Sequence, residues 1–363
     1  MFHGGVFDMP QKTFWKNKKV FVTGHTGFKG TWLCLWLKIL GAKVVGYSLD
    51  VPTKPCLFDL TKPPARTIWG DVRDLKKIKA GISKERPDIV FHLAAQPLVR
   101  ASYIHPVSTF ETNVLGTANL LEALRGSTVK AAVIITTDKV YDNKENGAAF
   151  KETDPLGGYD PYSASKGAAE LVVASYRNSF FNNKEYGKKH TTLISTARAG
   201  NVIGGGDFAQ DRLVADLVRA ILAQEELKIR NPQAVRPWQH VLEPLSGYLL
   251  LAEKLYAGKE KCAEAWNFGP EKSDVKSVEW IVRKMYAQWG DGQAYSVIRG
   301  EHAHEAQYLS LDITKAKRYL GWKPKWRLET ALEKTIEWTK AYRDKQNISA
   351  VCEKQIRKYA EEM

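Results

Sequence analysis

The feature that most constrains the fold is a glycine cluster between a strand-like run and a helix-like run. Residues 18–24, KKVFVTG, form an apolar run closed by Gly24, which predicts a buried strand. Residues 28–41, FKGTWLCLWLKILG, show helical periodicity and end at a glycine suited to a C-cap. Gly24, Gly27 and Gly30 follow a G-x-x-G-x-x-G spacing between the two. Glycines let a turn tighten and let the backbone approach a pyrophosphate at a helix N-terminus, the alternative being a plain tight turn.

The alternation of strand and helix continues along the first half of the chain. Strands alternating with helices at short spacing imply a doubly wound parallel sheet. Its ligands should lie at the carboxyl ends of the strands, near the point where the strand order reverses. We expect strands at 18–24, 43–50, 67–71, 88–95, 131–136 and the start of 190–207, and helices at 28–41, 74–87, 105–125 and 162–177.

Two aspartates bear on the kind of dinucleotide that this sheet would hold. Asp50 closes the second predicted strand, 20 residues after Gly30. An acid at this position accepts hydrogen bonds from an adenosine ribose and repels a 2′-phosphate, which favours NAD over NADP. Lys54 nearby is a small argument against this preference for NAD. Asp71, which ends the strand IWGD, is a candidate adenine contact, with an ordinary strand-end aspartate as the alternative.

Beyond about residue 203 the pattern loosens. Helical stretches at 211–225, 242–256, 277–289 and 328–344 are accompanied by the short strand-like pieces LKIR and AWNFG. We expect a Rossmann-like α/β sheet followed by a smaller C-terminal substrate-binding α+β domain, with elements partly interleaved. The expected divisions are a loose lead-in (1–17), an NAD-binding domain (18–200), a substrate-binding domain (201–344) and a charged, helix-capable tail (345–363).

The net charge of +14 favours acidic partners. The Lys and Arg residues are spread along the chain without a nucleic-acid-binding motif, so we expect a small polyanion such as a nucleotide diphosphate rather than nucleic acid. No apolar run approaches the roughly 20 residues of a membrane span, and the N-terminal residues lack the apolar core of a secretion signal. We therefore expect a cytoplasmic location and no membrane partner.

Cysteine and histidine usage predicts no metal site. The cysteines are scattered without a C-x-x-C pair, which is typical of buried thiols in a reducing compartment. His302 and His304 in EHAHEA are read as part of a polar loop. The cysteines are Cys34, Cys56, Cys262 and Cys352.

Tyr162 and Lys166 in PYSASK form the first candidate catalytic pair. Four residues apart on a predicted helix, both side chains lie on one face. A phenol titrates near pH ~10 in water, and a neighbouring ammonium lowers that pKa by stabilising the phenolate. The spacing alone also occurs by accident on exposed helices, so the pair gains its weight from the upstream glycine turn.

Several motifs together resemble one family. TGHTGFKG, HLAAQ (92–96), NVLGT (113–117), TTDKVY (136–141), YSASK and ARAGNVIGGGD (197–207) occur in the order found in extended short-chain dehydrogenases/reductases that act on nucleotide sugars. The similarity is greatest to the 4,6-dehydratase branch that uses CDP-glucose in O-antigen sugar pathways. It runs from Gly24 to about Arg236 and is less specific beyond.

The resemblance implies a catalytic set and a reaction. Tyr162, helped by Lys166 and Thr137, takes the proton of the sugar 4-hydroxyl while NAD takes the C4 hydride. The new ketone acidifies the C5 proton, Asp138 protonates the departing 6-hydroxyl, and the hydride returns to C6. The net reaction is loss of water, which makes the enzyme a lyase.

Lys139 departs from the dTDP-sugar dehydratases, which carry Glu after the Asp. A Lys acts as the C5 base only if desolvation or a nearby cation such as Lys166 lowers its pKa. As an ammonium it would instead stabilise the enolate. We favour Lys139 as the base, with the stabilising role left open.

The resemblance also implies cofactor and substrate contacts. Gln96, Asn201 and Arg236 are candidate substrate ligands, Arg236 as a charge-assisted phosphate contact or a surface charge. Asn113 serves either the site or local backbone. The expected NAD contacts are Gly24, Thr26, Gly27, Phe28, Lys29, Gly30, Asp50, Asp71, Val72, Leu93, Ala94, Ala95, Thr136, Tyr162 and Lys166.

Other functions remain as alternatives. A 4-epimerase on the same scaffold would not need Asp138 and Lys139. Dehydratases for dTDP-, GDP- or UDP-sugars stay open because no base-reading motif is visible. A dinucleotide-sensing protein without catalysis would be expected to lose Tyr162 or Lys166. Helices 105–125 and 162–177 are expected to pair in a homo-oligomer, a dimer or a tetramer.

Overall fold

The computed structural model describes residues 10–63, 65–290, 294–298 and 306–361. Within these residues, a sheet of seven parallel strands has the order β11-β6-β5-β4-β1-β2-β3. The order reverses at β1 and β4, where a doubly wound sheet opens toward a ligand. The expected Rossmann-like architecture is therefore confirmed. The strands are β1 (Lys19–Thr23), β2 (Lys43–Ser48), β3 (Ala65–Trp69), β4 (Ile89–His92), β5 (Ala131–Ile135), β6 (Leu193–Ala199) and β11 (Ala265–Phe268).

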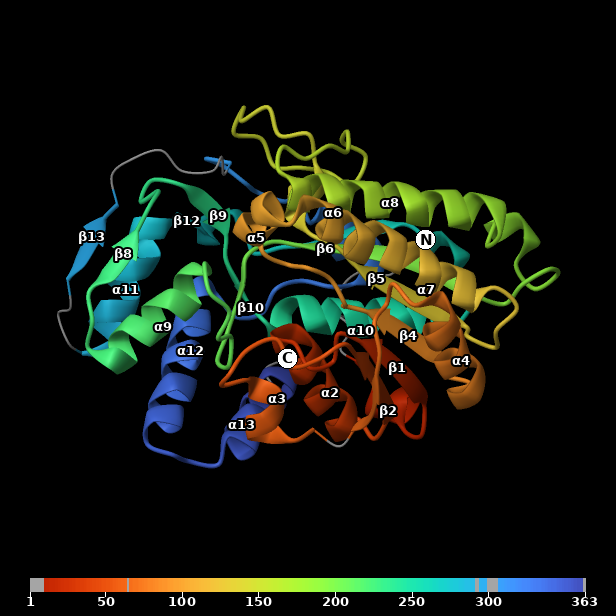
Figure 1. Cartoon of the computed structure of the whole chain (residues 1–363), viewed down its shortest axis with the longest axis horizontal. Coiled ribbons are helices and arrows are strands. Elements are labelled where there is room, and N and C mark those ends of the chain that lie inside the picture. Colours follow the sequence, from red (N-terminus) through yellow and green to blue (C-terminus); the bar gives the residue numbers. More distant parts are fainter. Residues whose placement is uncertain (1–9, 64, 291–293, 299–305, 362–363) are drawn as a thin grey trace.

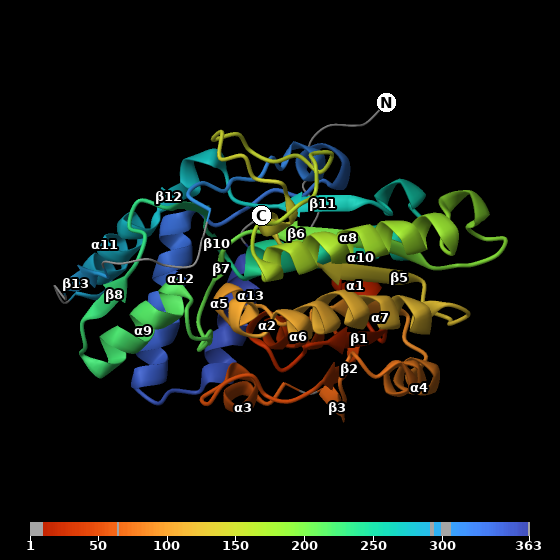
Figure 2. The same cartoon turned by 45° about the horizontal axis from the view of Figure 1, so that its top comes forward.

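Helices cover both faces of the sheet (Figures 1 and 2). One face carries α2 (Phe28–Ile39) and α10 (Leu242–Tyr256), and the other carries α4 (Leu75–Glu85), α7 (Gly116–Leu124) and α8 (Pro161–Ser179). The strands are buried on both faces, which explains their continuous apolar runs.

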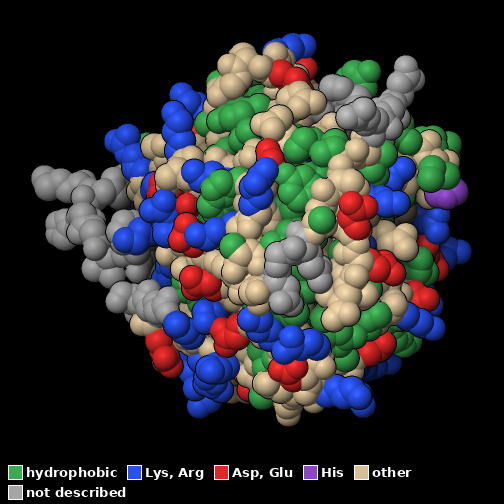
Figure 3. Space-filling model, turned by 90° about the vertical axis from the view of Figure 1, so that its left-hand side faces the viewer, with side chains coloured by type: hydrophobic (Ala, Val, Ile, Leu, Met, Phe, Trp, Pro, Cys, Tyr) green, Lys and Arg blue, Asp and Glu red, His purple; other side chains and the backbone are tan. Residues whose placement is uncertain are grey.

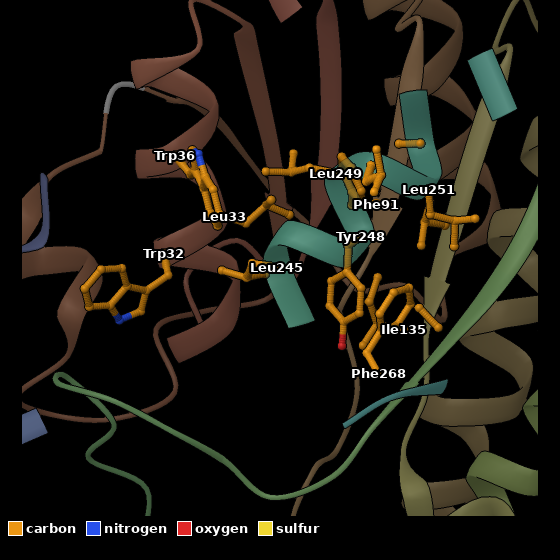
Figure 4. Packing of buried hydrophobic residues seen from close by; sticks show 14 of the residues in the cluster. Trp32, Leu33, Trp36, Phe91, Ile135, Leu245, Tyr248, Leu249, Leu251 and Phe268 are labelled. Atoms are coloured by element: carbon orange, nitrogen blue, oxygen red, sulfur yellow. The ribbon is translucent and has the colours of Figure 1, made fainter. Parts of the chain in front are cut away.

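The largest core lies between the sheet and the pair α2–α10. Figure 4 shows Leu33 of α2 on the side toward Leu245 and Leu249 of α10, with Trp32 and Trp36 of the same helix turned away from α10. All five side chains are buried. Burying a large apolar side chain contributes roughly 1.5–3 kcal/mol. This packing holds the N-terminus of α2, with its glycine turn, at the edge of the sheet.

A second lobe packs beside the carboxyl ends of the strands. Its own core contains Leu217, Ile281, Met285 and Leu332. Strand β11 and helix α10 come from the same stretch of chain as this lobe, but β11 belongs to the main sheet and α10 packs on it. The lobe comprises α9 (Leu213–Ala223), α11 (Val278–Trp289), α12 (Leu328–Arg343), β8 (Leu227–Ile229), β9 (Val235–Pro237), β12 (Val275–Ser277) and β13 (Tyr295–Val297).

Short elements connect these layers. The helix expected at 105–125 is interrupted by a π-helical turn, and several two- to three-residue strands and short helices were not expected. They are α3 (Leu57–Thr61), α5 (Val99–Ile104), α6 (Pro106–Phe110), the π turn Glu111–Leu115, a 3₁₀ turn (Asp138–Val140), β7 (Val202–Ile203) and β10 (Gln239–His240).

Both ends of the described chain are packed rather than loose. Residues 12–15 form α1 (Lys12–Trp15), and the indole of buried Trp15 donates a hydrogen bond of 2.6 Å to Glu253 Oε1. The loose lead-in is therefore wrong for this part, because Trp15 fills the core. The charged tail contains α13 (Ile348–Glu361), which packs on α2 through Cys352, Ile356 and Tyr359.

The surface agrees with a dispersed charge. On the face in Figure 3, Lys and Arg side chains are interspersed with Asp and Glu and do not form an unbroken basic stripe. Across the residues that the structure describes, no helix is both long and apolar enough to cross a bilayer.

Candidate active site

A cavity of about 290 Å³ lies where the carboxyl ends of β5 and β6 meet the second lobe. Its lining brings together segments far apart in sequence: the start of α2, the turn after β5, the first turn of α8, the loop before α9 and the strands β8 and β9. Parallel strands direct their carboxyl ends to one edge, so this is the location expected for a ligand site.

The glycine turn is shaped by close backbone contacts. Gly24 has a φ of +70°, and a Cβ on it would lie 2.6 Å from Ala94 N. A Cβ on Gly30 would lie 2.1 Å from Gly24 O. No side chain caps the N-terminus of α2, whose N-cap is Gly27. The first-turn N–H groups of this 12-residue helix are thus available to an anion, which fits a dinucleotide pyrophosphate.

The two candidate ribose and adenine contacts have different surroundings. Asp50 is exposed, and its Oδ1 accepts a hydrogen bond from Val51 N at 2.7 Å. Asp71 is bound by the guanidinium of Arg73 at 2.6 Å, and hydrogen bonds from Arg73 lower the pKa of Asp71 although burial opposes this. Thr26 donates to the Asp50 carbonyl at 2.7 Å, which joins the glycine turn to the end of β2.

The segment TTDK leaves β5 at the cavity wall. Asp138 is 2% exposed, and its Oδ1 accepts a hydrogen bond from Thr137 Oγ1 at 3.0 Å. Its Oδ2 is buried and has no hydrogen-bond partner among the described residues. Lys139 is half-buried and lines the cavity, and its Nζ forms no ion pair with any residue that the structure describes. Both residues lie in the cavity wall.

Tyr162 and Lys166 lie on the first two turns of α8. Asp160 caps this helix by accepting a hydrogen bond from Ser163 N at 2.9 Å, and Pro161 occupies the first position. Tyr162 and Thr137 line the same cavity, and Thr137 acts to lower the pKa of Tyr162. Lys166 Nζ donates to Ile135 O at 3.2 Å.

The expected depression of the tyrosine pKa is wrong, because burial outweighs the groups that favour the phenolate. Burial raises the pKa of Tyr162 to about 12, against the lowering effects of the Thr137 hydrogen bond and of Arg212. Burial and then the charge of Lys29 lower the pKa of Lys166 to about 7, whereas Glu170 raises it. The buried site therefore favours the neutral form of both groups.

A buried ion pair supports these residues from behind. The carboxylate of Glu170, one turn after Lys166, accepts from Arg198 Nη2 at 2.9 Å and from Arg198 Nε at 3.0 Å. It also accepts from Thr136 Oγ1 at 2.6 Å and Thr196 Oγ1 at 2.7 Å. Glu170 thus ties α8 to β6 and to the residue that precedes Thr137.

The candidate substrate ligands differ in availability. The side chain of Gln96 is hydrogen-bonded to the backbone of Leu98. Its Nε2 donates to Leu98 O at 3.1 Å, and its Oε1 accepts from Leu98 N at 2.6 Å. Gln96 does not line the cavity, whereas Asn201 and Arg236 do. Asn201 Oδ1 is buried without a described partner. Asn113 binds Gln96 N at 2.8 Å and Ser165 Oγ at 2.9 Å, which favours the local structural role.

Sequence reasoning missed several charged residues that line the same cavity, among them Arg100, Asp211, Arg212 and Arg230. Arg212 pairs with Asp207 at 2.8 Å and keeps an elevated pKa through this pairing although burial opposes it. Lys29 was expected only as a cofactor contact, yet burial and then Arg212 lower its pKa to about 8. Only their position relative to other loops reveals Arg100, Asp211, Arg212 and Arg230, since none of these four belongs to a local motif.

No metal cluster was expected. In the described ranges of the chain no group of three or more His, Cys, Asp or Glu is placed to bind a metal ion. His302 and His304 lie outside the described residues. The four cysteines are buried and unpaired.

The doubly wound sheet, the glycine turn and the Tyr162–Lys166 pair beside TTDK define a short-chain dehydrogenase/reductase of the extended kind. Within that class the chain belongs to the GDP-mannose 4,6 dehydratase family, whose profile matches residues 21–335. The resemblance inferred from the motifs is confirmed at this level.

Individual relatives agree with this assignment. The CDP-glucose 4,6-dehydratase of Salmonella typhimurium is 51% identical over 337 residues, which cover 92% of this chain and 94% of that protein. A dTDP-glucose 4,6-dehydratase of Xanthomonas campestris is 27% identical and covers 87% of this chain and 92% of its own. MoeE5, solved in complex with UDP-glucose and NAD, is 25% identical with a TM-score of 0.74, over 89% of this chain and 99% of that one.

Proposed function

We propose that the protein is an NAD-dependent nucleotide-sugar 4,6-dehydratase that converts CDP-glucose to CDP-4-dehydro-6-deoxyglucose and water. The observation that carries the proposal is the presence of Thr137, Asp138, Lys139 and Tyr162 in the wall of one cavity. The 51% identical Salmonella protein, named a CDP-glucose 4,6-dehydratase, supports the choice of nucleotide.

The residues present fit NAD. The uncapped N-terminus of α2 beside Gly24 suits the pyrophosphate, and the exposed carboxylate of Asp50 at the end of β2 suits the adenosine ribose. Lys166 would hold the second ribose. Bound NAD would supply a reversible hydride acceptor for C4 of the sugar.

Tyr162 would receive the proton of the 4-hydroxyl. Thr137 lines the same cavity and would donate to the same sugar oxygen. Since burial raises the pKa of Tyr162 to about 12, the step requires cations near the phenol. Arg212, whose charge lowers the pKa of Tyr162 and whose own pKa is raised by Asp207, is the cation available there.

Lys139 and Asp138 would perform the elimination. Lys139 Nζ would take the C5 proton after C4 becomes a ketone. Asp138 Oδ2, buried and without a described partner, would donate a proton to the departing 6-hydroxyl. A 4-epimerase needs neither group, so their exposure to the cavity favours dehydration over epimerisation.

Incubation of the protein and NAD with CDP-, dTDP-, GDP- and UDP-glucose tests the proposal. We expect a 4-keto-6-deoxy product from CDP-glucose, identified by NMR. Epimerised sugar, or a product only from another nucleotide, would reject the assignment.

We further propose that the protein forms a homo-oligomer in the cytoplasm and supplies a deoxysugar for O-antigen. Support for the oligomer comes from exposed apolar side chains gathered on α5, α6, the π turn and α8. They are Ile104 (72% exposed), Val107 (70%), Leu171 (60%) and Leu115 (50%). Contiguous exposed apolar residues of this kind mark protein–protein contacts.

A further inference from the structure

Three charged residues form an ion-pair cluster in the cavity wall that the reaction does not use. Asp211 accepts a hydrogen bond from Arg100 Nη1 at 2.7 Å and from Arg230 Nη1 at 3.3 Å. The cluster joins α5, the loop before α9 and the residue after β8. All three side chains line the cavity.

The cluster leaves Oδ2 of Asp211 as a hydrogen-bond acceptor close to guanidinium N–H donors. Both arginines bind Asp211 Oδ1, and Asp211 Oδ2 has no hydrogen-bond partner in the described part of the chain. Arg100 likewise uses one N–H of its guanidinium within these residues. Burial raises the pKa of Asp211, but Arg100 and Arg230 outweigh it and lower the net value, so the acceptor stays ionised.

Two members of the cluster belong to the second lobe, since Asp211 precedes α9 and Arg230 follows β8. Tyr162 lies on α8, which packs on the main sheet, so the cavity extends from the reacting groups to this lobe. A nucleotide sugar places its diphosphate next to the hexose and its base beyond. With the hexose at Tyr162 and the diphosphate near Arg212 and Arg236, the base falls toward Asp211.

Pyrimidine bases differ in the order of their donors and acceptors. Cytosine presents the N4 amino donor beside the N3 acceptor, whereas uracil and thymine present the O4 acceptor beside an N3–H donor. A carboxylate oxygen next to a guanidinium matches cytosine and opposes O4 of uracil or thymine. Aspartate accepting from cytosine N4 and arginine donating to base acceptors are established pairings.

We propose that Asp211, together with Arg100 and Arg230, reads the base of the nucleotide sugar and selects cytosine over uracil and thymine. The inference rests on the proposed function for its substrate class. It adds the side chains responsible for nucleotide choice, which the motifs of the sequence do not reveal.

The inference is tested by comparing how three ligands bind to wild-type protein and to one variant, both as the full chain with NAD. Calorimetry would measure the binding of CDP, UDP and the 5′-diphosphate of 2-pyrimidinone riboside, which lacks the 4-amino group. Wild-type protein should bind CDP about tenfold or more tightly than either of the others. In Asp211→Asn the three ligands should bind within about threefold of each other, because an amide accepts or donates equally well.

A matched control and the contrary outcomes complete the test. Asp344→Asn removes an exposed aspartate paired with Arg343 at 2.8 Å and should keep the wild-type preference. If Asp211→Asn weakens all three ligands equally, or if wild-type protein ignores loss of the amino group, the inference is overturned while the dehydratase proposal stands. The comparison of CDP with the 2-pyrimidinone ligand needs only wild-type protein, so it tests the inference even if Asp211→Asn fails to fold. Wild-type protein without preference for CDP over UDP would overturn both the nucleotide assignment and the inference.

Discussion

Lys139 and Asp138 are adjacent in sequence and both line the cavity, yet the proposal assigns them opposite proton transfers. Lys139 Nζ has no ion-pair partner in the described residues. Asp138 Oδ2 is buried and has no hydrogen-bond partner among the same residues. Hydrogen exchange at C5 of the sugar separates the two roles, since it reports C5 deprotonation without loss of water.

Lys139→Ala should still oxidise C4 but stop before elimination. Without the amine no group removes the C5 proton, so reduced cofactor should accumulate, seen by its absorbance, and C5 should not exchange with deuterium oxide. Dehydration should fall at least ~100-fold. Lys144→Ala, which changes a lysine 75% exposed and paired with Asp142, should behave as wild type. Near-normal dehydration by Lys139→Ala would remove the base role.

Asp138→Asn should give a different arrest. An amide cannot protonate the departing oxygen, so water loss should fall while Lys139 still exchanges the C5 proton. NMR in deuterium oxide would show deuterium at C5 of an intact 4-keto hexose. Normal turnover in this variant would exclude Asp138 as the acid.

At the level of elements, the Glu170–Arg198 pair connects α8 with β6. Both side chains are at most 4% exposed. Removing one partner from a buried pair leaves the other charge uncompensated, which costs about 3–5 kcal/mol. Glu170→Gln should therefore lower the free energy of unfolding by about 3 kcal/mol at pH 7, measured by urea denaturation. Glu122→Gln, in an exposed pair with Arg125, should cost less than about 1 kcal/mol.

The pH dependence of that cost has a definite sign. Burial raises the pKa of Glu170, but Arg198, Thr136 and Thr196 outweigh it, so the net pKa is lowered. A carboxyl with a lowered folded pKa stabilises above its unfolded pKa near 4.5 and loses this contribution as the pH falls through the folded value. The gap between wild type and Glu170→Gln should shrink at acidic pH. A gap that grows there would contradict the assignment.

Glu243 should show the reverse behaviour where α10 meets α13. Its carboxylate accepts from Trp326 N at 2.7 Å and Tyr359 Oη at 2.7 Å. Burial raises its pKa from 4.5 to about 7, so its contribution to stability falls as the pH rises between these values. Relative to Glu243→Gln, wild type should lose about 2–3 kcal/mol of unfolding free energy between pH ~5 and ~8. Thermal denaturation at both values would reveal a constant gap if this is wrong.

Over the whole molecule, the apolar patch of Ile104, Val107, Leu115 and Leu171 predicts an assembly. Val107→Asp with Leu171→Asp would place charges in the buried interface and should convert the oligomer to monomer, measured by light scattering after size exclusion. Val297→Asp changes an apolar residue 45% exposed on β13 and should leave the assembly intact. A monomeric wild-type protein would contradict the prediction.

Much of the fold follows from local pattern. The strands of the main sheet lie within a few residues of their expected positions, because strands buried on both faces read as apolar runs bounded by turns. The strands β7, β9, β10, β12 and β13 were not expected. They are two or three residues long and depend on partners far along the chain, so they carry no periodic signal.

The residues of the candidate site also fall into two groups, those recognised from the sequence and those found only in the folded structure. Gly24, Tyr162 and Lys166 were identified from spacing within one turn or helix, whereas the roles of Asp138 and Lys139 were inferred from the family resemblance. The catalytic roles of Asp138, Lys139, Tyr162 and Lys166 stay predictions.

The sequence by itself determined the α/β alternation, the glycine turn and the order of the family's motifs, since each depends on neighbours within about a dozen residues. Only the tertiary structure decided that Arg100, Asp211 and Arg230 share a cavity wall with Tyr162. It also decided that burial, rather than Lys166, dominates the pKa of Tyr162. Desolvation and charge act through space, and the groups that exert them come from distant loops brought together only by the closed fold.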